Sequence, residues 1–238
     1  MNTEAITFTI DGKKIEARRG DTILEAADRA GVYIPRLCWM KELLPAGVCR
    51  VCTVRVNGRP QAACTQPAAA GMVVENDTEE LRQLRRDLID MLFVEGNHFC
   101  MFCERSGNCE LQALAYRFGI AAPGFPYAFP QRDADASHPD IRIDRDRCVL
   151  CARCVRASRE LDGKAVFGFT GRGSGKRLAC NAESGLGGTS AAADDRAIAA
   201  CPTGSLLLKR TGYAVPVGRR RFDRLPIGAD IELPTAGE

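Results

Sequence analysis

Cysteine is the residue type that offers the most chemistry in this chain, because 12 of the 238 residues are cysteines. Eleven of them form three consecutive groups, which span residues 38–64, 100–109 and 148–201. Grouped thiolates are soft ligands that hold zinc or iron–sulfur clusters. The N-terminal residues include an early acidic residue and no apolar stretch typical of a secretory signal, so we expect a cytoplasmic protein whose thiols stay reduced and bind metal.

The first candidate ligand set has the spacing C-x10-C-x2-C-x11-C. It comprises Cys38, Cys49, Cys52 and Cys64. Four thiolates from one loop-rich segment can hold either Zn²⁺ or a [2Fe–2S] cluster. A structural zinc site usually pairs its ligands in two short loops, whereas only Cys49 and Cys52 are so paired here. This asymmetry favours a [2Fe–2S] cluster, with zinc and purely structural thiols as the alternatives.

The second candidate set contains three cysteines and needs one further ligand. It comprises His98, Cys100, Cys103 and Cys109. Because His98 lies two residues from Cys100, we predict that its imidazole completes a [4Fe–4S] site. Three cysteines and one histidine are also a common structural zinc set, so zinc stays an alternative here.

The third candidate set is the most specific signal in the sequence. It comprises Cys148, Cys151, Cys154 and Cys201. The C-x2-C-x2-C run supplies three corners of a [4Fe–4S] cubane, and a cysteine followed by proline, as at Cys201, is the usual remote fourth ligand. A two-cluster ferredoxin would carry two such runs, so we expect Cys201 to close its own site. Cys180 then belongs to no set, and we expect no ligand role for it.

The segments around these sets predict an α+β chain in three modules and a tail. Alternating strands, an Asp11-Gly12 turn, a helix over 22–30 and an Asn57-Gly58 turn predict a β-rich first domain. Helices from Thr78 and from Glu110 predict a helical second one. The predicted segments are 1–77, 78–133, 134–212 and a polar tail at 213–238. In the third segment, residues 134–212, we expect a short strand over 141–145, a helix that ends at Gly163 and an alanine-rich helix near 191–200.

Other features carry weaker signals. The stretch 171–177 looks like a phosphate loop, but Thr170 and Arg177 occupy positions where a Walker A motif needs glycine and serine or threonine. We expect His138 to be exposed and Trp39 to shield a cluster from water. The net charge of +3 and dispersed basic residues argue against nucleic-acid binding, and no apolar stretch reaches the roughly 20 residues of a membrane span.

Taken in order, the motifs LCW, GVCRVC, EGNHFCMFCERSGNCELQ, DRCVLCARCV and CPTGSL resemble one family over about residues 5–220. The chain is similar to the small iron–sulfur (diaphorase) subunit of cytoplasmic NAD-reducing [NiFe] hydrogenases. That subunit is related to the N-terminal region of the complex I large iron–sulfur subunit. The resemblance implies a β-grasp [2Fe–2S] domain, a mostly helical His-ligated [4Fe–4S] domain and a small [4Fe–4S] ferredoxin-like domain. The single residue between His98 and Cys100 is similar to the hydrogenase branch, whereas the complex I spacing would place the histidine at Gly96.

The resemblance also implies a function. The chain would relay electrons through one [2Fe–2S] and two [4Fe–4S] clusters, with FMN and NAD on a flavoprotein subunit and the Ni–Fe centre on the small and large hydrogenase subunits. It would carry no substrate site of its own. The alternatives are an electron-input subunit of a formate dehydrogenase or complex I-like assembly, a freestanding ferredoxin, and a zinc-bound structural or RNA-binding protein. Because the tail holds no ligand, we expect truncation after Tyr213 to spare all three clusters, and to weaken docking if the tail contacts a partner.

Overall fold

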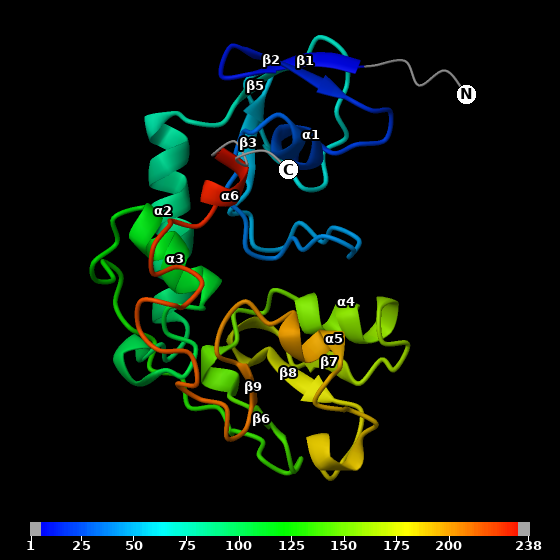
Figure 1. The fold of residues 1–238 in the computed structure, drawn as a ribbon, viewed down its shortest axis with the longest axis vertical. Helices are drawn as coiled ribbons and strands as arrows, with labels where there is room; N and C mark the ends of the chain where they lie inside the picture. The colour runs from blue at the N-terminus through cyan, green and yellow to red at the C-terminus, as the bar shows by residue number, and fades with distance from the viewer. Residues whose placement is uncertain (1–5, 233–238) are drawn as a thin grey trace.

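The computed structural model describes residues 6–232. Residues 1–5 and 233–238, the ends of the first predicted domain and of the predicted tail, lie outside the described residues. Figure 1 shows three regions along the long axis: a sheet with one helix at the top, helices α2 and α3 at one side, and two small sheets with helices α4 and α5 at the bottom. The C-terminal segment returns along α2 and α3 toward the first region.

The first region is a five-stranded sheet in the order β2-β1-β5-β3-β4. The strands are β1 (Ile6–Ile10), β2 (Lys13–Ala17), β3 (Thr53–Val56), β4 (Arg59–Ala62) and β5 (Val73–Glu75). β1 and β5 are parallel, and the other neighbours are antiparallel. With helix α1 (Ile23–Arg29) packed against the sheet, this is a β-grasp arrangement, so the predicted fold of this region is confirmed.

Local sequence signals explain the turns and the helix start of this region. Asp11 and Gly12, and likewise Asn57 and Gly58, adopt positive φ angles between 49° and 80°, as the central residues of a type I′ turn must. Thr22 caps α1, because its side chain accepts the Glu25 N–H while the Glu25 carboxylate accepts the Thr22 N–H. The predicted hairpins and capping box are therefore confirmed.

The core of the first region comes from its own segment of the chain. Its buried residues all lie between residues 8 and 74, and they include Phe8, Leu24, Val54 and Val74, each at most 1% exposed. Because burial of each such side chain contributes about 1.5–3 kcal/mol, this local core is a strong source of stability.

The second region contains α2 (Glu79–Val94) and α3 (Glu110–Arg117). Thr78 caps α2 by accepting the Leu81 N–H, and the helix packs Ile89 and Phe93 against Leu111 and Leu114 of α3. The same core contains residues from far along the chain in both directions. These residues are Tyr33, Leu37, Val51 and Ile227.

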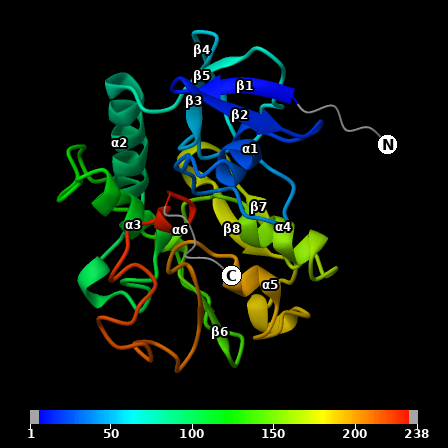
Figure 2. The same cartoon turned by 45° about the horizontal axis from the view of Figure 1, so that its top comes forward.

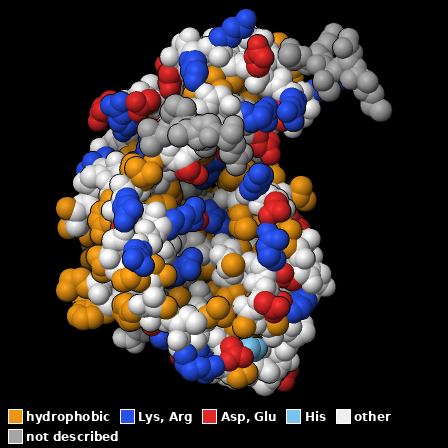
Figure 3. Space-filling model, in the orientation of Figure 1, with side chains coloured by type: hydrophobic (Ala, Val, Ile, Leu, Met, Phe, Trp, Pro, Cys, Tyr) orange, Lys and Arg blue, Asp and Glu red, His pale blue; other side chains and the backbone are white. Residues whose placement is uncertain are grey.

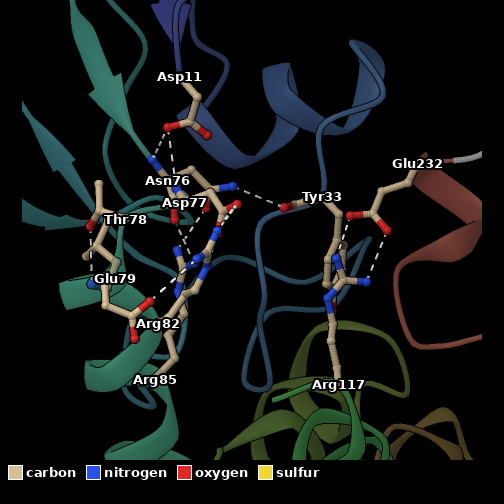
Figure 4. Close-up of polar contacts among 11 residues, drawn as sticks. Asp11, Tyr33, Asn76, Asp77, Thr78, Glu79, Arg82, Arg85, Arg117 and Glu232 are labelled. Carbon is tan, nitrogen blue, oxygen red and sulfur yellow. Dashed lines mark hydrogen bonds and ion pairs between the residues drawn. The ribbon is translucent and has the colours of Figure 1, made fainter. Parts of the chain in front are cut away.

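The segment predicted to be a polar tail contributes to this core. Ile227 is 7% exposed, and Phe222 and Ile231 pack against the same cluster. The last described helix, α6 (Ala229–Glu232), is tied to α3 by an ion pair between Glu232 and Arg117 (Figure 4). Residues 222–232 are thus a folded part of the second region, which the polar composition of the segment did not indicate.

The joint between α2 and the sheet depends on one buried arginine. Arg85 is 2% exposed and donates hydrogen bonds to the backbone carbonyls of Asn76 and Thr53 and to the Asn76 side chain (Figure 4). The Asn76 N–H in turn donates to the Asp11 carboxylate. Burial lowers the pKa of Arg85 only to about 10, so this guanidinium is charged at neutral pH and its donors are largely matched by acceptors.

The third region contains two small antiparallel sheets and two helices. The elements are β6 (Ile141–Ile143) paired with β9 (Leu206–Leu208), β7 (Phe167–Thr170) paired with β8 (Arg177–Cys180), α4 (Arg153–Glu160) and α5 (Arg196–Ala199). The predicted alanine-rich helix near 191–200 is wrong in extent. The Asp195 carboxylate accepts the Ala192 N–H, a turn that competes with the helix, so α5 begins only at Arg196.

The prediction that His138 is exposed is also wrong. Its side chain is 9% exposed, Nδ1 accepts the backbone N–H groups of Asp140 and Ile141, and Nε2 lies 3.1 Å from the Ala191 carbonyl oxygen. These bonds fix the start of β6 against a loop that is distant in sequence. His138 is therefore a hydrogen-bonded structural residue.

The loop between α1 and β3 reaches the third region (Figures 1 and 2). Arg156 of α4 donates to the backbone carbonyls of Cys38 and Leu44, and the Leu44 N–H donates to Glu160. The loop that carries Cys38 thus contacts α4 of the third region as well as the sheet of the first. Within residues 6–232, no helix is both long enough and apolar enough to cross a membrane.

Candidate metal centres

The four cysteines of the first set converge in the loops that flank β3 and β4. The Sγ atoms of Cys52 and Cys64 are 3.4 Å apart, and the Cys38 N–H donates to the Cys49 Sγ at 3.3 Å. Cys38, Cys52 and Cys64 are buried and Cys49 is partly exposed. The predicted set therefore lies together at the edge of the first core.

The sulfur atoms of this set are also electrostatically coupled. Hydrogen bonding from Cys49, and then from Cys64, lowers the pKa of the Cys38 thiol, whereas the same contacts raise the pKa of Cys49 and Cys64. A hydrogen bond from Cys64 likewise lowers the pKa of the Cys52 thiol to about 7, so neighbouring thiols of the set favour the thiolate form of Cys38 and Cys52. Four thiolates at such close range need a cation to neutralise them, which fits a metal cluster.

The second set surrounds a cavity where α2 ends and α3 begins. Cys100 begins a short 3-10 helix that ends at Phe102, Cys103 follows it, and Cys109 occupies the position before α3. The side chains of these cysteines line one cavity with His98. Burial raises the pKa of the Cys109 thiol to about 12.

His98 has the properties of a ligand. Its Nε2 is buried and has no hydrogen-bond partner among the described residues, and an unpartnered buried nitrogen is costly. Burial, and then the charge of Arg147, lowers the pKa of His98 to about 4, so the imidazole is neutral at ordinary pH. The Nε2 lone pair is therefore available to an acceptor such as iron.

Gly96 makes room for this imidazole. A Cβ atom at position 96 would lie 2.4 Å from the His98 Nε2 and 2.9 Å from the Asp146 carbonyl oxygen. Any side chain at position 96 would therefore displace the ring of His98. The observed position of the imidazole therefore depends on the glycine at position 96.

The third set lines a second cavity, to which Phe169, Leu178 and Pro202 also contribute. Cys151, Cys154 and Cys201 are each less than 9% exposed, and Cys148 is partly exposed. Leu150 and Ala152, which flank Cys151, adopt φ angles of 51° and 61°. Such left-handed conformations are strained for these residue types and are concentrated at functional sites, where they direct side chains toward a common centre.

Cys180 lies apart from both cavities, in β8, where it is partly buried. Burial raises the pKa of its thiol to about 11, so the thiol is protonated at neutral pH and is a poor nucleophile. The part of the chain that the structure describes contains no group of three or more His, Cys, Asp or Glu side chains that could hold a single metal ion.

Sequence reasoning missed the residues that join the second and third sites. Glu110, next to Cys109, forms a bidentate ion pair with Arg153, next to Cys154, at 2.6 and 3.0 Å. The two side chains are only 14% and 6% exposed. Arg147 and Gly204, from the third region, line the cavity of the second set. The one sequence signal for these contacts is that Glu110, Arg147 and Arg153 each lie next to a cysteine of a ligand set.

Exposed apolar side chains occur beside the first and second sites and in the C-terminal segment. They are Leu44 and Val48 beside the first site, Phe99, Met101 and Phe102 beside the second, and Tyr213, Val215 and Val217 further along the chain. Figure 3 shows hydrophobic side chains gathered on the flank that carries α2, α3 and the loops after them.

Three family models match the chain in the order of the three sites. A 2Fe-2S iron-sulfur cluster binding domain matches residues 3–79, the NADH-ubiquinone oxidoreductase-G iron-sulfur binding region matches residues 85–123, and the ferredoxin-like domain of NADH-quinone oxidoreductase subunit 3 matches residues 138–207. The first two descriptions favour iron–sulfur clusters over zinc at the sets where zinc was an alternative. The chain is therefore an iron–sulfur protein, two of whose three modules match regions of NADH-ubiquinone and NADH-quinone oxidoreductase subunits.

Individual relatives narrow this class. The HoxS gamma subunit of the NAD-reducing hydrogenase of Cupriavidus necator is 41% identical over 92% of this chain and 94% of its own length. A chain in a crystal structure of NAD+-reducing [NiFe]-hydrogenase in the H2-reduced state superposes with a TM-score of 0.92, at 50% identity, over 95% of this chain and 98% of that one. The 78 kDa subunit of NADH-ubiquinone oxidoreductase from Candida albicans is 31% identical over 98% of this chain, which spans 33% of that longer protein. The chain belongs to the family of the gamma subunit of NAD-reducing hydrogenase.

Proposed function

We propose that this chain is the electron-relay subunit of an NAD-reducing hydrogenase, between an FMN- and NAD-binding flavoprotein subunit and the [NiFe] hydrogenase module. The observation that carries the proposal is the match, over nearly the full length of both chains, to a gamma subunit and to a chain of a solved NAD+-reducing [NiFe]-hydrogenase. The small and large hydrogenase subunits would be the partners on one side and the flavoprotein subunit the partner on the other. A cytoplasmic location is part of this proposal.

The proposed cofactors are one [2Fe–2S] cluster and two [4Fe–4S] clusters, which exchange single electrons when bound. Cys38, Cys49, Cys52 and Cys64 would hold the first. His98, Cys100, Cys103 and Cys109 would hold the second. Cys148, Cys151, Cys154 and Cys201 would hold the third. The convergence of the first set and the two cysteine-lined cavities support this assignment.

The protein would contribute ligands, charge and exclusion of water. The buried cysteines and the apolar walls of the cavity of the third set would keep water from a bound cluster, and charged side chains near the sulfur atoms would set its electrostatic environment. We also propose module boundaries near residues 77, 133 and 212. The end of the sheet at Glu75 and the start of α2 at Glu79 support the first of these.

Metal analysis of anaerobically purified protein tests the proposal. We expect two iron atoms from the first set and four from each of the others, about ten per chain. Affinity purification of the native complex is expected to recover a nickel-containing partner and a flavoprotein. Stoichiometric zinc with little iron would contradict the cluster assignment, and a molybdenum-containing partner in place of nickel would favour the formate dehydrogenase alternative.

A further inference from the structure

The cavity of the second set is completed by residues of the third region. Arg147 ends a short 3-10 helix and immediately precedes Cys148, and Gly204 lies just after Cys201 and Pro202. Both line the cavity that contains His98 and the three cysteines. A Cβ atom on Gly204 would lie 2.9 Å from the Cys103 Sγ, so the backbone of the third region approaches this sulfur closely.

Arg147 is the charged group directed at this sulfur. Its Nη1 donates to the Cys103 Sγ at 3.6 Å and to the Glu104 carboxylate at 2.7 Å, and its Nε lies 3.1 Å from the Asp144 carboxylate. The side chain is 15% exposed. Two carboxylates thus fix a guanidinium that is largely removed from water, and its planar donors reach a ligand sulfur at the same time.

The backbone of the same residue belongs to the third site. The Arg147 carbonyl oxygen accepts the Thr203 hydroxyl at 2.8 Å, and Thr203 lies two residues after Cys201. The Arg147 side chain therefore contacts the second site while its peptide group packs in the third. No other arginine donates to a cysteine sulfur in the part of the chain that the structure describes.

A fixed positive charge and a hydrogen bond to a ligand sulfur favour the state of a cluster that carries more negative charge. Reduction adds one negative charge. We propose that Arg147 is a positioning residue that raises the reduction potential of the second cluster by donating from its guanidinium to Cys103. The proposal rests on the second ligand set assigned above.

The test compares Arg147→Gln with Arg142→Gln in the intact complex. Arg142 lies near the same two carboxylates, Glu104 at 3.9 Å and Asp144 at 3.4 Å, but makes no hydrogen bond to a cysteine among residues 6–232. The potential is measured by EPR during reductive poising, on the signal that the His98→Cys variant perturbs. At the wild-type midpoint, the ratio of reduced to oxidised cluster is expected to fall on the order of tenfold in Arg147→Gln, equivalent to about 59 mV for one electron. It is expected to stay unchanged in Arg142→Gln.

A purely structural role predicts a different result: loss of cluster or of stability without a shift in the potential of the remaining cluster. An unchanged potential in Arg147→Gln, or an equal shift in Arg142→Gln, would overturn the proposal. If Arg147→Gln does not assemble the cluster, the same potential is measured in Arg147→Lys. The single ammonium of lysine cannot contact both carboxylates and the sulfur in the same way, so the reduction potential of the second cluster is expected to fall by less than in Arg147→Gln. A wild-type potential in Arg147→Lys would overturn the proposal. Absence of the second signal from the wild-type protein would instead contradict the proposed function.

Discussion

The sheet region and the helical region around the second site differ in where along the sequence their core residues come from. The sheet buries side chains that all lie between residues 8 and 74. The core around α2 and α3 combines these helices with residues 33–51 before them and with Ile227 near the other end of the chain. The first core is thus local in sequence, whereas the second is assembled from distant segments.

The same difference applies to the metal centres. The first ligand set comes from one continuous loop-rich segment, and its sulfur atoms contact one another. The cavity of the second set is completed by Arg147 and Gly204 of the third region. We infer that the first site takes all four sulfur ligands from its own domain and only backbone and apolar contacts from elsewhere, such as the bond from Arg156 to the Cys38 carbonyl, whereas the second and third sites form together. The following predictions probe that difference, from the largest expected effect to the smallest.

Truncation after Tyr213 is expected to destabilise the second site more than the first. It removes Phe222, Ile227 and Ile231 from the second core, and burial of an isoleucine contributes about 1.5–3 kcal/mol. This expectation reverses the prediction from sequence that all three clusters would survive. The measurements are iron content and the EPR signal of each cluster. Truncation after Glu232 is the control, because it removes only residues outside the described structure, and full retention of the second cluster in the shorter chain would contradict the inference.

Glu110→Gln is expected to weaken the joint between the second and third regions. It leaves the buried Arg153 without its carboxylate, and breaking a buried ion pair costs about 3–5 kcal/mol. Glu80→Gln, in the joint between α2 and the sheet, is the control: Glu80 pairs with Arg55 but is 69% exposed, so a cost of about 1 kcal/mol or less is expected. Denaturant unfolding of the two variants checks the contrast. Equal losses of stability would mean that the two joints do not differ.

Gly96→Ala is expected to displace His98 and reduce the content of the second cluster, because the new Cβ would lie 2.4 Å from Nε2. Gly168→Ala in β7 is a matched control, since no atom lies within 4 Å of its added Cβ. Neither glycine has a positive φ, so backbone strain does not distinguish them. EPR and iron analysis report the outcome, and a normal second cluster in Gly96→Ala would show that the ring can move without loss of the site.

His98→Cys is expected to retain a four-iron cluster and to lower its potential. The substitution replaces a neutral imidazole by an anionic thiolate, which disfavours the addition of an electron. The clusters of the first and third sites serve as internal references in the same sample. If no potential changes in the variant, His98 is not a ligand.

Cys180→Ser is expected to have the smallest effect. The thiol lies in β8, outside both cysteine-lined cavities, and its raised pKa keeps it protonated at neutral pH. Iron content and all three EPR signals should match those of the wild-type protein. Loss of any one signal would require a different ligand assignment.

Several features follow from the sequence because they depend on neighbours in the chain. The Asp11-Gly12 and Asn57-Gly58 turns, the Thr22 cap and the start of α2 after Thr78 form as predicted, since each depends on backbone preferences within a few residues. The ligand sets could likewise be proposed from cysteine spacing, because a cluster constrains how far apart its ligands lie along a loop.

Other features were decided only by tertiary structure. His138 is buried because the loop at Ala191 covers it, residues 222–232 fold because a core built by distant helices accepts them, and Arg147 meets Cys103 because the third region packs against the second. Each depends on contacts between segments far apart in sequence, and no local pattern of polarity or spacing encodes such contacts. The sequence by itself determined which residues could hold clusters in this protein. The tertiary packing determined which charges surround those clusters and which sites depend on one another.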